Sequence, residues 1–156
     1  MAEKLKTVMG SEVRFNRQAL RAVRAYARTK PWSGSIEKRW RAMAALSRTL
    51  SGIYGMGNGP AIYPCLKWQD CYIHPLRCIL ICPYNLSVVT FLHEFKHAMD
   101  SFRGQPSHEE STRRWSLWLF KKCFPKEFSR CCFDGQRLLR RWSSHERGRL
   151  EVRYRD

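Results

Sequence analysis

Apolar residues recur every three or four positions in four stretches of the chain, which is the spacing of an amphipathic helix. A residue that caps helices well stands at the start of each stretch. The pattern therefore predicts helices over 11–29, 35–51, 87–102 and 107–124, capped in turn by Ser11, Ser35, Asn85 or Ser87, and Ser107. Proline and glycine residues separate these helices, as expected of breaks in a helical pattern.

Three short runs between the second and third helices favour strands. Residues 77–82, Arg-Cys-Ile-Leu-Ile-Cys, give the strongest strand signal, because the run is short and apolar and Pro83 stops it. Residues 61–64 and 71–73 are candidates for two more short strands. Together these elements predict an α+β fold that is mostly helical, with a small sheet packed beside the helix over 87–102.

The length of the chain, 156 residues, suits one domain rather than two. Hydrophobic residues make up 44% of it, which is enough for a core and excludes a wholly disordered chain. No apolar run approaches the roughly 20 residues of a membrane-spanning helix, and no apolar segment of a secretory signal follows Met1. We expect one domain over 1–133, no membrane span, and an arginine-rich tail over 134–156 with a short helix near 135–143.

The chain is strongly basic, with 29 Lys and Arg against 13 Asp and Glu and a formal net charge of +16. Such a charge attracts polyanions: nucleic acid, an anionic membrane face or an acidic partner. Arginines recur at three- or four-residue steps within the first predicted helix, at Arg14, Arg17, Arg21, Arg24 and Arg28. They form a candidate surface for phosphates, although a merely solvated basic face has the same pattern. Nonspecific nucleic acid is therefore one partner that the basic surface allows.

Seven cysteines stand at positions 65, 71, 78, 82, 123, 131 and 132. Their number is odd and no signal peptide is visible, so we expect free thiols in a reducing, cytoplasmic compartment. The first four lack the CxxC pairs that are typical of structural zinc sites. A zinc site built from those four is conceivable, but buried free cysteine explains them better.

The sequence His93-Glu94-Phe95-Lys96-His97 lies within the helix predicted over 87–102 and has the form H-E-x-x-H. Residues four apart lie on the same face of a helix, so the two imidazoles can bind one zinc ion. Glu94 stands beside the first ligand, where it can act as a general base on water. A pair of histidines on a partly buried helix, with no metal, is the plainer alternative.

A zinc site of this type needs a third protein ligand and one open position. The x-x-G-x-x-H continuation of the metzincins is absent, and the next candidates open the following helix: His108, Glu109 and Glu110. We rank Glu110 first, His108 second and Glu109 third. Glu110 also has a structural alternative, because Ser107 to Glu110 reads as a capping box, S-x-x-E.

The pattern over roughly 77–125 resembles the compact zincin-like metallopeptidases. Within these, it is most similar to the ImmA/IrrE type, in which the next helix begins with a glutamate and a small residue, as Glu110-Ser111 does. The SprT-like family is a neighbour, matched more loosely by His108 with Trp115. Lys96 departs from both, because they usually carry a small or apolar residue there. The resemblance implies ligands at His93, His97 and Glu110, with Glu94 as catalytic base.

These residues predict a zinc-dependent metallopeptidase that hydrolyses protein or peptide substrates. Glu94 would take a proton from the attacking water and pass it to the leaving amine. An additional donor to the oxyanion could come from His74, Tyr84 or His145, and the sequence does not choose among them. The rival hypothesis is a basic nucleic-acid-binding protein with a structural or vestigial metal site.

Overall fold

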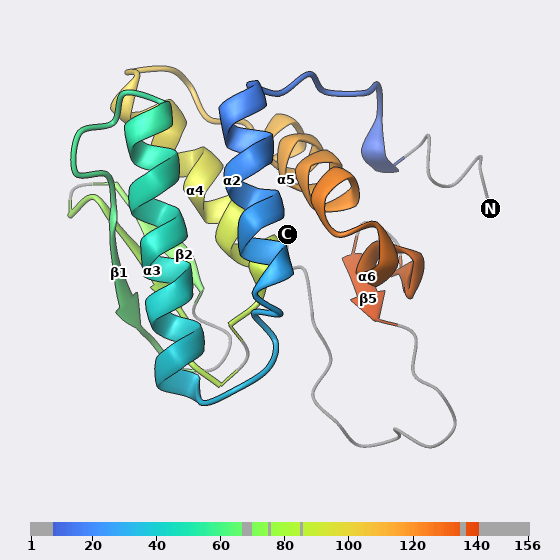
Figure 1. Cartoon of the computed structure of the whole chain (residues 1–156). Helices are drawn as coiled ribbons and strands as arrows, with labels where there is room; N and C mark the ends of the chain where they lie inside the picture. Colours follow the sequence, from blue (N-terminus) through green and yellow to red (C-terminus); the bar gives the residue numbers. More distant parts are fainter. Residues whose placement is uncertain (1–7, 67–69, 75, 85, 135–136, 141–156) are drawn as a thin grey trace.

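The computed structural model describes residues 8–66, 70–74, 76–84, 86–134 and 137–140. Helices form most of the architecture, and a small sheet lies beside them (Figure 1). The elements in chain order are α2 (Arg17–Arg28), α3 (Ile36–Ile53), β1 (Ala61–Pro64), β2 (Cys71–Ile73), β3 (Cys78–Ile81), α4 (Val88–Phe102), α5 (Glu109–Cys123), α6 (Pro125–Ser129), β4 (Cys131–Asp134) and β5 (Arg137–Arg140). The predicted α+β fold is thus confirmed.

The main sheet has three strands in the order β1-β3-β2. β1 runs parallel to β3, whereas β2 runs antiparallel to it, with Tyr72 opposite Ile79. This order leaves β2 at an edge of the sheet. A separate hairpin, β4 with β5, lies near the end of the described chain.

Helix α4 is the central element of the core. It contacts β2 and β3 on one side and α5 on another. Phe91, Leu92, Phe95 and Ala98 along it have no exposed surface. Burying an apolar surface of this size favours one fixed orientation of the helix, which holds its remaining side chains in place. The predicted cap is confirmed, since the Ser87 hydroxyl accepts a hydrogen bond from the Thr90 N–H.

The three predicted strands and the helices that begin after Ser35 and Ser87 are confirmed. The first helix begins later than predicted, at Arg17, because Asn16 rather than Ser11 accepts the capping hydrogen bond, from the Gln18 N–H at 2.7 Å. The short helix predicted near 135–143 is wrong where it is described, because Arg137–Arg140 pairs with Cys131–Asp134 as a strand. The rest of the predicted arginine-rich tail, 141–156, lies outside the described residues.

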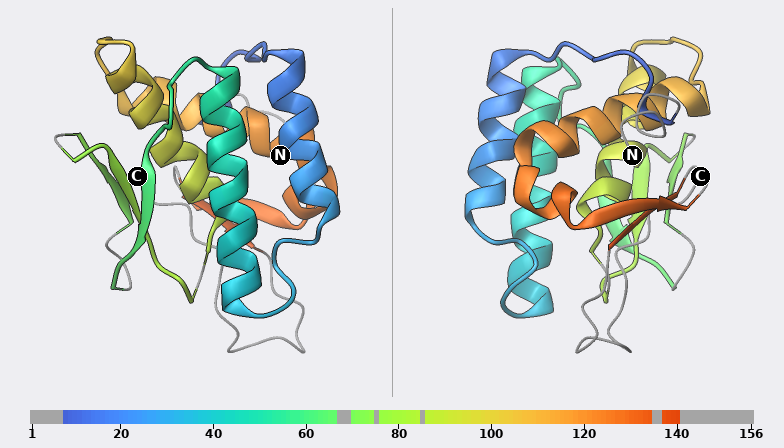
Figure 2. Two further views of the ribbon diagram at one scale, coloured as in Figure 1. Left: turned by 60° about the vertical axis from the view of Figure 1, so that its left-hand side comes forward. Right: turned by 90° about the vertical axis from the view of Figure 1, so that its right-hand side faces the viewer.

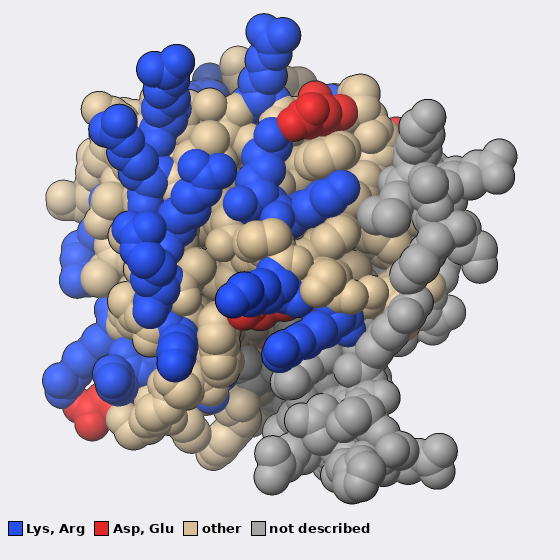
Figure 3. All heavy atoms as spheres, turned by 45° about the vertical axis from the view of Figure 1, so that its right-hand side comes forward, with Lys and Arg blue, Asp and Glu red and all other residues tan. Residues whose placement is uncertain are grey.

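The arrangement places α2 and the main sheet at opposite sides of the fold, with α3 and α4 between them (Figure 2). Lys and Arg side chains spread over the face that α2 and α5 present, with few acidic side chains among them (Figure 3). Within the described part of the chain, no helix is both long and apolar enough to cross a membrane. All seven cysteines are free thiols, as predicted.

Candidate metal centre

The two histidines of the H-E-x-x-H sequence lie one helical turn apart on α4, with their rings directed to the same place. The Nε2 atoms of His93 and His97 are 3.1 Å apart, and the rings meet edge to face at 4.7 Å between centroids. His93 is 3% exposed, because the flank of α4 that carries it is covered by neighbouring elements. Burial, followed by the neighbouring His97, lowers the pKa of His93 to about 4. The imidazole is therefore neutral at physiological pH, which is the form that binds metals.

A carboxylate from α5 completes the group. The Oε2 of Glu109 lies 3.1 Å from the His93 Nε2, and its Oε1 lies 2.9 Å from the His97 Nε2. Glu109 is the first residue of α5, and α5 packs against α4 after a short turn in which Gly104 has φ +63°. The turn reverses the chain, so the start of α5 comes back to the two histidines.

The carboxylate at the histidines therefore belongs to Glu109, which ranked third in the sequence analysis, and not to Glu110. Successive residues of a helix point about 100° apart, so Glu110 cannot share the direction of Glu109, and its side chain is exposed. The predicted capping box over Ser107 to Glu110 is also wrong, because it does not form. His108 occupies the cap position without a side-chain hydrogen bond to the helix, and the Ser107 hydroxyl bonds elsewhere.

The donor set fits a single metal ion. One ligand atom from each of His93, His97 and Glu109 lies within 4.8 Å of the others, and no other group of three His, Cys, Asp or Glu in the described residues does so. Zinc ligands at about 2.1 Å in tetrahedral directions stand about 3.4 Å apart, close to the separations found here. The four clustered cysteines, which were an alternative zinc site, do not form such a group within the described chain.

A cavity of about 690 Å³ opens onto these three residues. It is lined by β2, by the polar flank of α4 and by the turn between α4 and α5. If these three residues held an ion, the open space beside them would leave a coordination position for water or substrate, an arrangement typical of catalytic rather than structural zinc.

Glu94 lines the same cavity and is tied to the sheet. Its Oε2 accepts a hydrogen bond of 2.8 Å from the backbone N–H of Tyr72 on β2. Burial is the main cause that raises the pKa of Glu94 to about 8, and the nearby carboxylates of Glu109 and Asp70 act in the same direction. The hydrogen bond from Tyr72 acts in the opposite direction and lowers it. A carboxyl group poised near neutrality can both take and return a proton.

A chain of polar side chains that was not predicted from the sequence lies behind His97. The Nδ1 of His97 is 2.6 Å from the Ser107 hydroxyl, which donates to the Oδ2 of Asp100 at 3.3 Å. Lys96 forms an ion pair with the other oxygen of Asp100. This explains the unusual Lys96, whose charge neutralises a carboxylate that is only 4% exposed. The spacing of Lys96 and Asp100, four residues apart on one helix, was the available sequence signal.

Of the three candidate oxyanion donors, the structure brings His74 to the cavity. Its Nδ1 bonds the Ser101 hydroxyl, which also accepts a hydrogen bond of 3.1 Å from the Tyr72 phenol. Tyr84 is 71% exposed and does not line the cavity. His145 lies outside the described residues.

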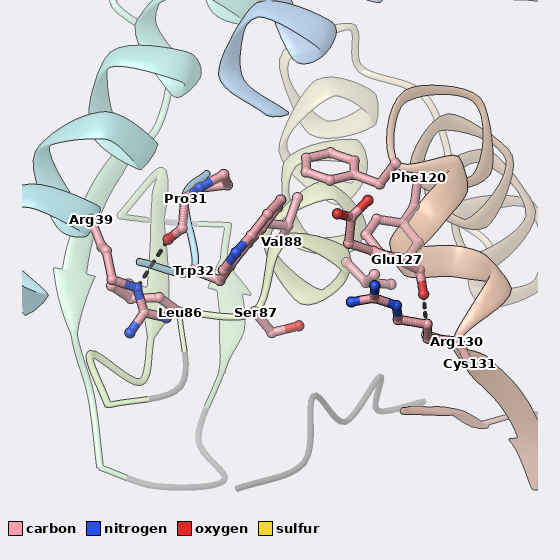
Figure 4. Close-up of a pocket in the computed structure, with 12 residues that line it drawn as sticks. Pro31, Trp32, Arg39, Leu86, Ser87, Val88, Phe120, Glu127, Arg130 and Cys131 are labelled. Carbon is pink, nitrogen blue, oxygen red and sulfur yellow. Dashed lines mark hydrogen bonds between the residues drawn. The ribbon is translucent and has the colours of Figure 1, made fainter. Parts of the chain in front are cut away.

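A second, largely apolar pocket lies between the α2–α3 turn, the start of α4 and helices α5 and α6 (Figure 4). Its volume is about 160 Å³, below the roughly 300 Å³ at which ligand sites usually begin. Trp32 and Phe120 are among its lining residues, and no group of metal ligands faces it. The chemically equipped cavity is therefore the one at His93 and His97.

Comparison with known proteins assigns neither a family nor a function to the chain. No protein-family model, curated protein or solved structure matches the chain.

Proposed function

We propose that this protein is a zinc-dependent metallopeptidase that hydrolyses peptide bonds in protein or peptide substrates. One observation carries the proposal: Glu109 meets the two histidines of an H-E-x-x-H helix, and Glu94 lines the same open cavity. The supporting resemblance is to the compact zincin-like metallopeptidases, with the carboxylate ligand at Glu109 in place of the expected Glu110.

Zinc is the metal that suits this donor set best. Two imidazoles and one carboxylate with a free position make up a common catalytic zinc site. Iron(II) binds the same donors in some oxygenases. The raised pKa of Glu94 beside the ligands favours hydrolysis, which needs an acid–base group at this place.

Each residue of the centre has its own role in the proposed hydrolysis. His93, His97 and Glu109 would hold the ion, which when bound lowers the pKa of water to about 7 and polarises a carbonyl. Glu94 takes the proton of the attacking water and later delivers it to the leaving amine. His74, from the opposite wall, donates a hydrogen bond to the oxygen on which negative charge develops.

The experiment is hydrolysis of an unfolded protein and a mixed peptide library by the full zinc-loaded chain. Wild type should cleave, and a chelator should stop cleavage until zinc is restored. Glu94→Gln should keep its zinc and lose at least about 100-fold in rate, because a general base contributes that much or more. Glu110→Gln is the matched control, since it changes a neighbouring exposed carboxylate. Equal rates for Glu94→Gln and wild type would refute the proposal.

The second candidate function is a basic nucleic-acid-binding protein with a structural or vestigial metal site. The specific observation in its favour is the arginine-bearing surface of α2. This rival predicts no cleavage by wild type in the presence of zinc, whether the site holds a structural ion or none, so the same assay separates the two functions.

A further inference from the structure

Four arginines stand in a single row along α2. Arg17, Arg21, Arg24 and Arg28, called the arginine row below, are spaced by four, three and four residues. At about 100° per residue, their side chains leave the helix within a sector of roughly 60°. All four are exposed.

Burial of the opposite side of α2 keeps the arginine row facing solvent. The opposite side of α2 buries Ala19, Val23 and Tyr26 against the rest of the fold, where α2 packs on α3 and α5. Tyr26 meets Phe124 edge to face, with the ring centroids 6.3 Å apart. Rotating α2 about its axis would expose these side chains, so the row has a fixed direction.

Within the described part of the chain, no ion pair offsets the charge of the arginine row. The sequence contains no Asp or Glu between positions 13 and 36. Among the acidic side chains that the structure describes, none forms an ion pair with the four arginines; Glu37 pairs with Arg41, and Glu12 with Lys122. Further Lys and Arg side chains continue the positive surface from α2 towards α5 (Figure 3).

We propose that the arginine row binds the phosphate backbone of duplex nucleic acid. From Arg17 to Arg28 the helix rises about 16 Å at 1.5 Å per residue. Duplex DNA carries one phosphate per about 3.4 Å of axis on each strand, so a row of this length lies along about five base pairs, whose two strands hold more phosphates than the row has arginines. Guanidinium groups fixed on a rigid helix therefore face a surface on which phosphates recur regularly.

The make-up of α2 favours a duplex over other polyanions. Surfaces for single strands interleave basic residues with exposed aromatic rings for base stacking, and amphipathic membrane-surface helices insert large apolar side chains. The large exposed hydrophobic residues of the described chain all lie off α2, namely Trp32, Ile36, Tyr63, Leu66, Leu76 and Tyr84. The contact is thus with backbone phosphates, without base readout.

The row is remote from the metal centre. β2 lines the cavity, and the sheet to which β2 belongs lies across the fold from α2 (Figure 2). A duplex on α2 consequently leaves the cavity open. This inference does not depend on the proposed peptidase function, and its variants change no residue of the metal centre.

The test is the affinity of the full chain for a 25-base-pair DNA duplex, measured by fluorescence anisotropy between about 50 and 300 mM salt. Four phosphate contacts predict a slope of log K against log salt of about −3.6 from the row alone. Arg21→Gln with Arg24→Gln should make the slope about 1.8 less steep and weaken binding at least tenfold at 100 mM salt. The same titration with a duplex RNA of equal length shows whether the row binds the DNA or the RNA backbone more tightly.

A matched control removes the same charge from outside the row, by Arg48→Gln with Arg77→Gln, both exposed. We expect this control to lose clearly less affinity for the duplex than Arg21→Gln with Arg24→Gln does, and both double variants to keep the wild-type zinc content. Wild type should also bind single strands, and vesicles with 30% anionic lipid, more weakly than it binds the duplex. Equal losses for the two double variants would overturn it, because total charge rather than the row would then set the affinity. A flat salt dependence, or tighter binding to the vesicles, would overturn it as well.

Discussion

The Nδ1 of His97 lies 2.6 Å from the hydroxyl of Ser107. Because that hydroxyl donates its proton to Asp100, the imidazole Nδ1 must be the donor in the first hydrogen bond. The Nε2 of His97 then keeps its lone pair and faces Glu109 and His93. Ser107, a predicted helix cap, thus fixes the tautomer of a candidate metal ligand.

Removing this hydroxyl should weaken zinc binding. Ser107→Ala is expected to raise the zinc dissociation constant by about 10- to 100-fold, the usual effect of losing a hydrogen-bond partner of a ligand histidine. Ser111→Ala is the matched control, since among the described residues its hydroxyl bonds the backbone carbonyl of His108 and no side chain of the metal centre. Competition with a chromogenic chelator gives both constants. Equal constants for the two variants would show that Ser107 does not orient His97.

Phe95, between the two histidines in sequence, should be important for stability. Its side chain has no exposed surface and meets the rings of Phe91 and Tyr54. Phe95→Ala should lower the free energy of unfolding by about 3–5 kcal/mol, whereas Leu66→Ala, at a side chain that is 74% exposed, should change it by less than about 0.5 kcal/mol. Urea denaturation measures both. A loss below about 1 kcal/mol for Phe95→Ala would contradict the central position of α4.

The buried carboxyl of Glu94 should make stability depend on pH. Its pKa is about 8 in the folded chain, above the ordinary value of 4.5, so the folded state binds the proton more tightly than the unfolded state. This contribution is fully present below pH 4.5 and is lost as the pH rises to about 8, by at most about 1.4 kcal/mol per pH unit.

The measurement compares the unfolding free energies of zinc-stripped wild type and Glu94→Gln at several pH values. The comparison cancels the opposite effect of His93, whose lowered pKa is common to both proteins. Wild type should become progressively less stable than Glu94→Gln between pH 5 and pH 8. A difference that stays constant over this range would show that Glu94 is solvated rather than buried.

Local sequence patterns predicted much of this fold. The three strands and helix α4 follow from short apolar runs and from a cap at Ser87. The pairing of His93 with His97 depends only on helical spacing, so it was predictable as well. By contrast, β5 forms by pairing with its neighbour β4 in a hairpin, whereas residues 137–140, Arg-Leu-Leu-Arg, taken alone fit a helix as well as a strand.

Which carboxylate reaches the two histidines was not predictable from the sequence either. A shift of one residue in a helix turns a side chain by about 100°, so the choice between Glu109 and Glu110 depends on where α5 begins. Ser107 could cap that helix locally, but it bonds His97 and Asp100 on α4 instead. The start of α5 is therefore set by a tertiary contact that no local pattern contains.

The zinc content of purified Glu109→Gln beside Glu110→Gln tests the proposed metal centre most directly. We expect about one zinc per chain in wild type and in Glu110→Gln, and a strongly reduced content in Glu109→Gln, because Glu109 rather than Glu110 reaches the two histidines. Full zinc occupancy in Glu109→Gln together with loss in Glu110→Gln would contradict the proposed centre, as would the absence of zinc from wild type.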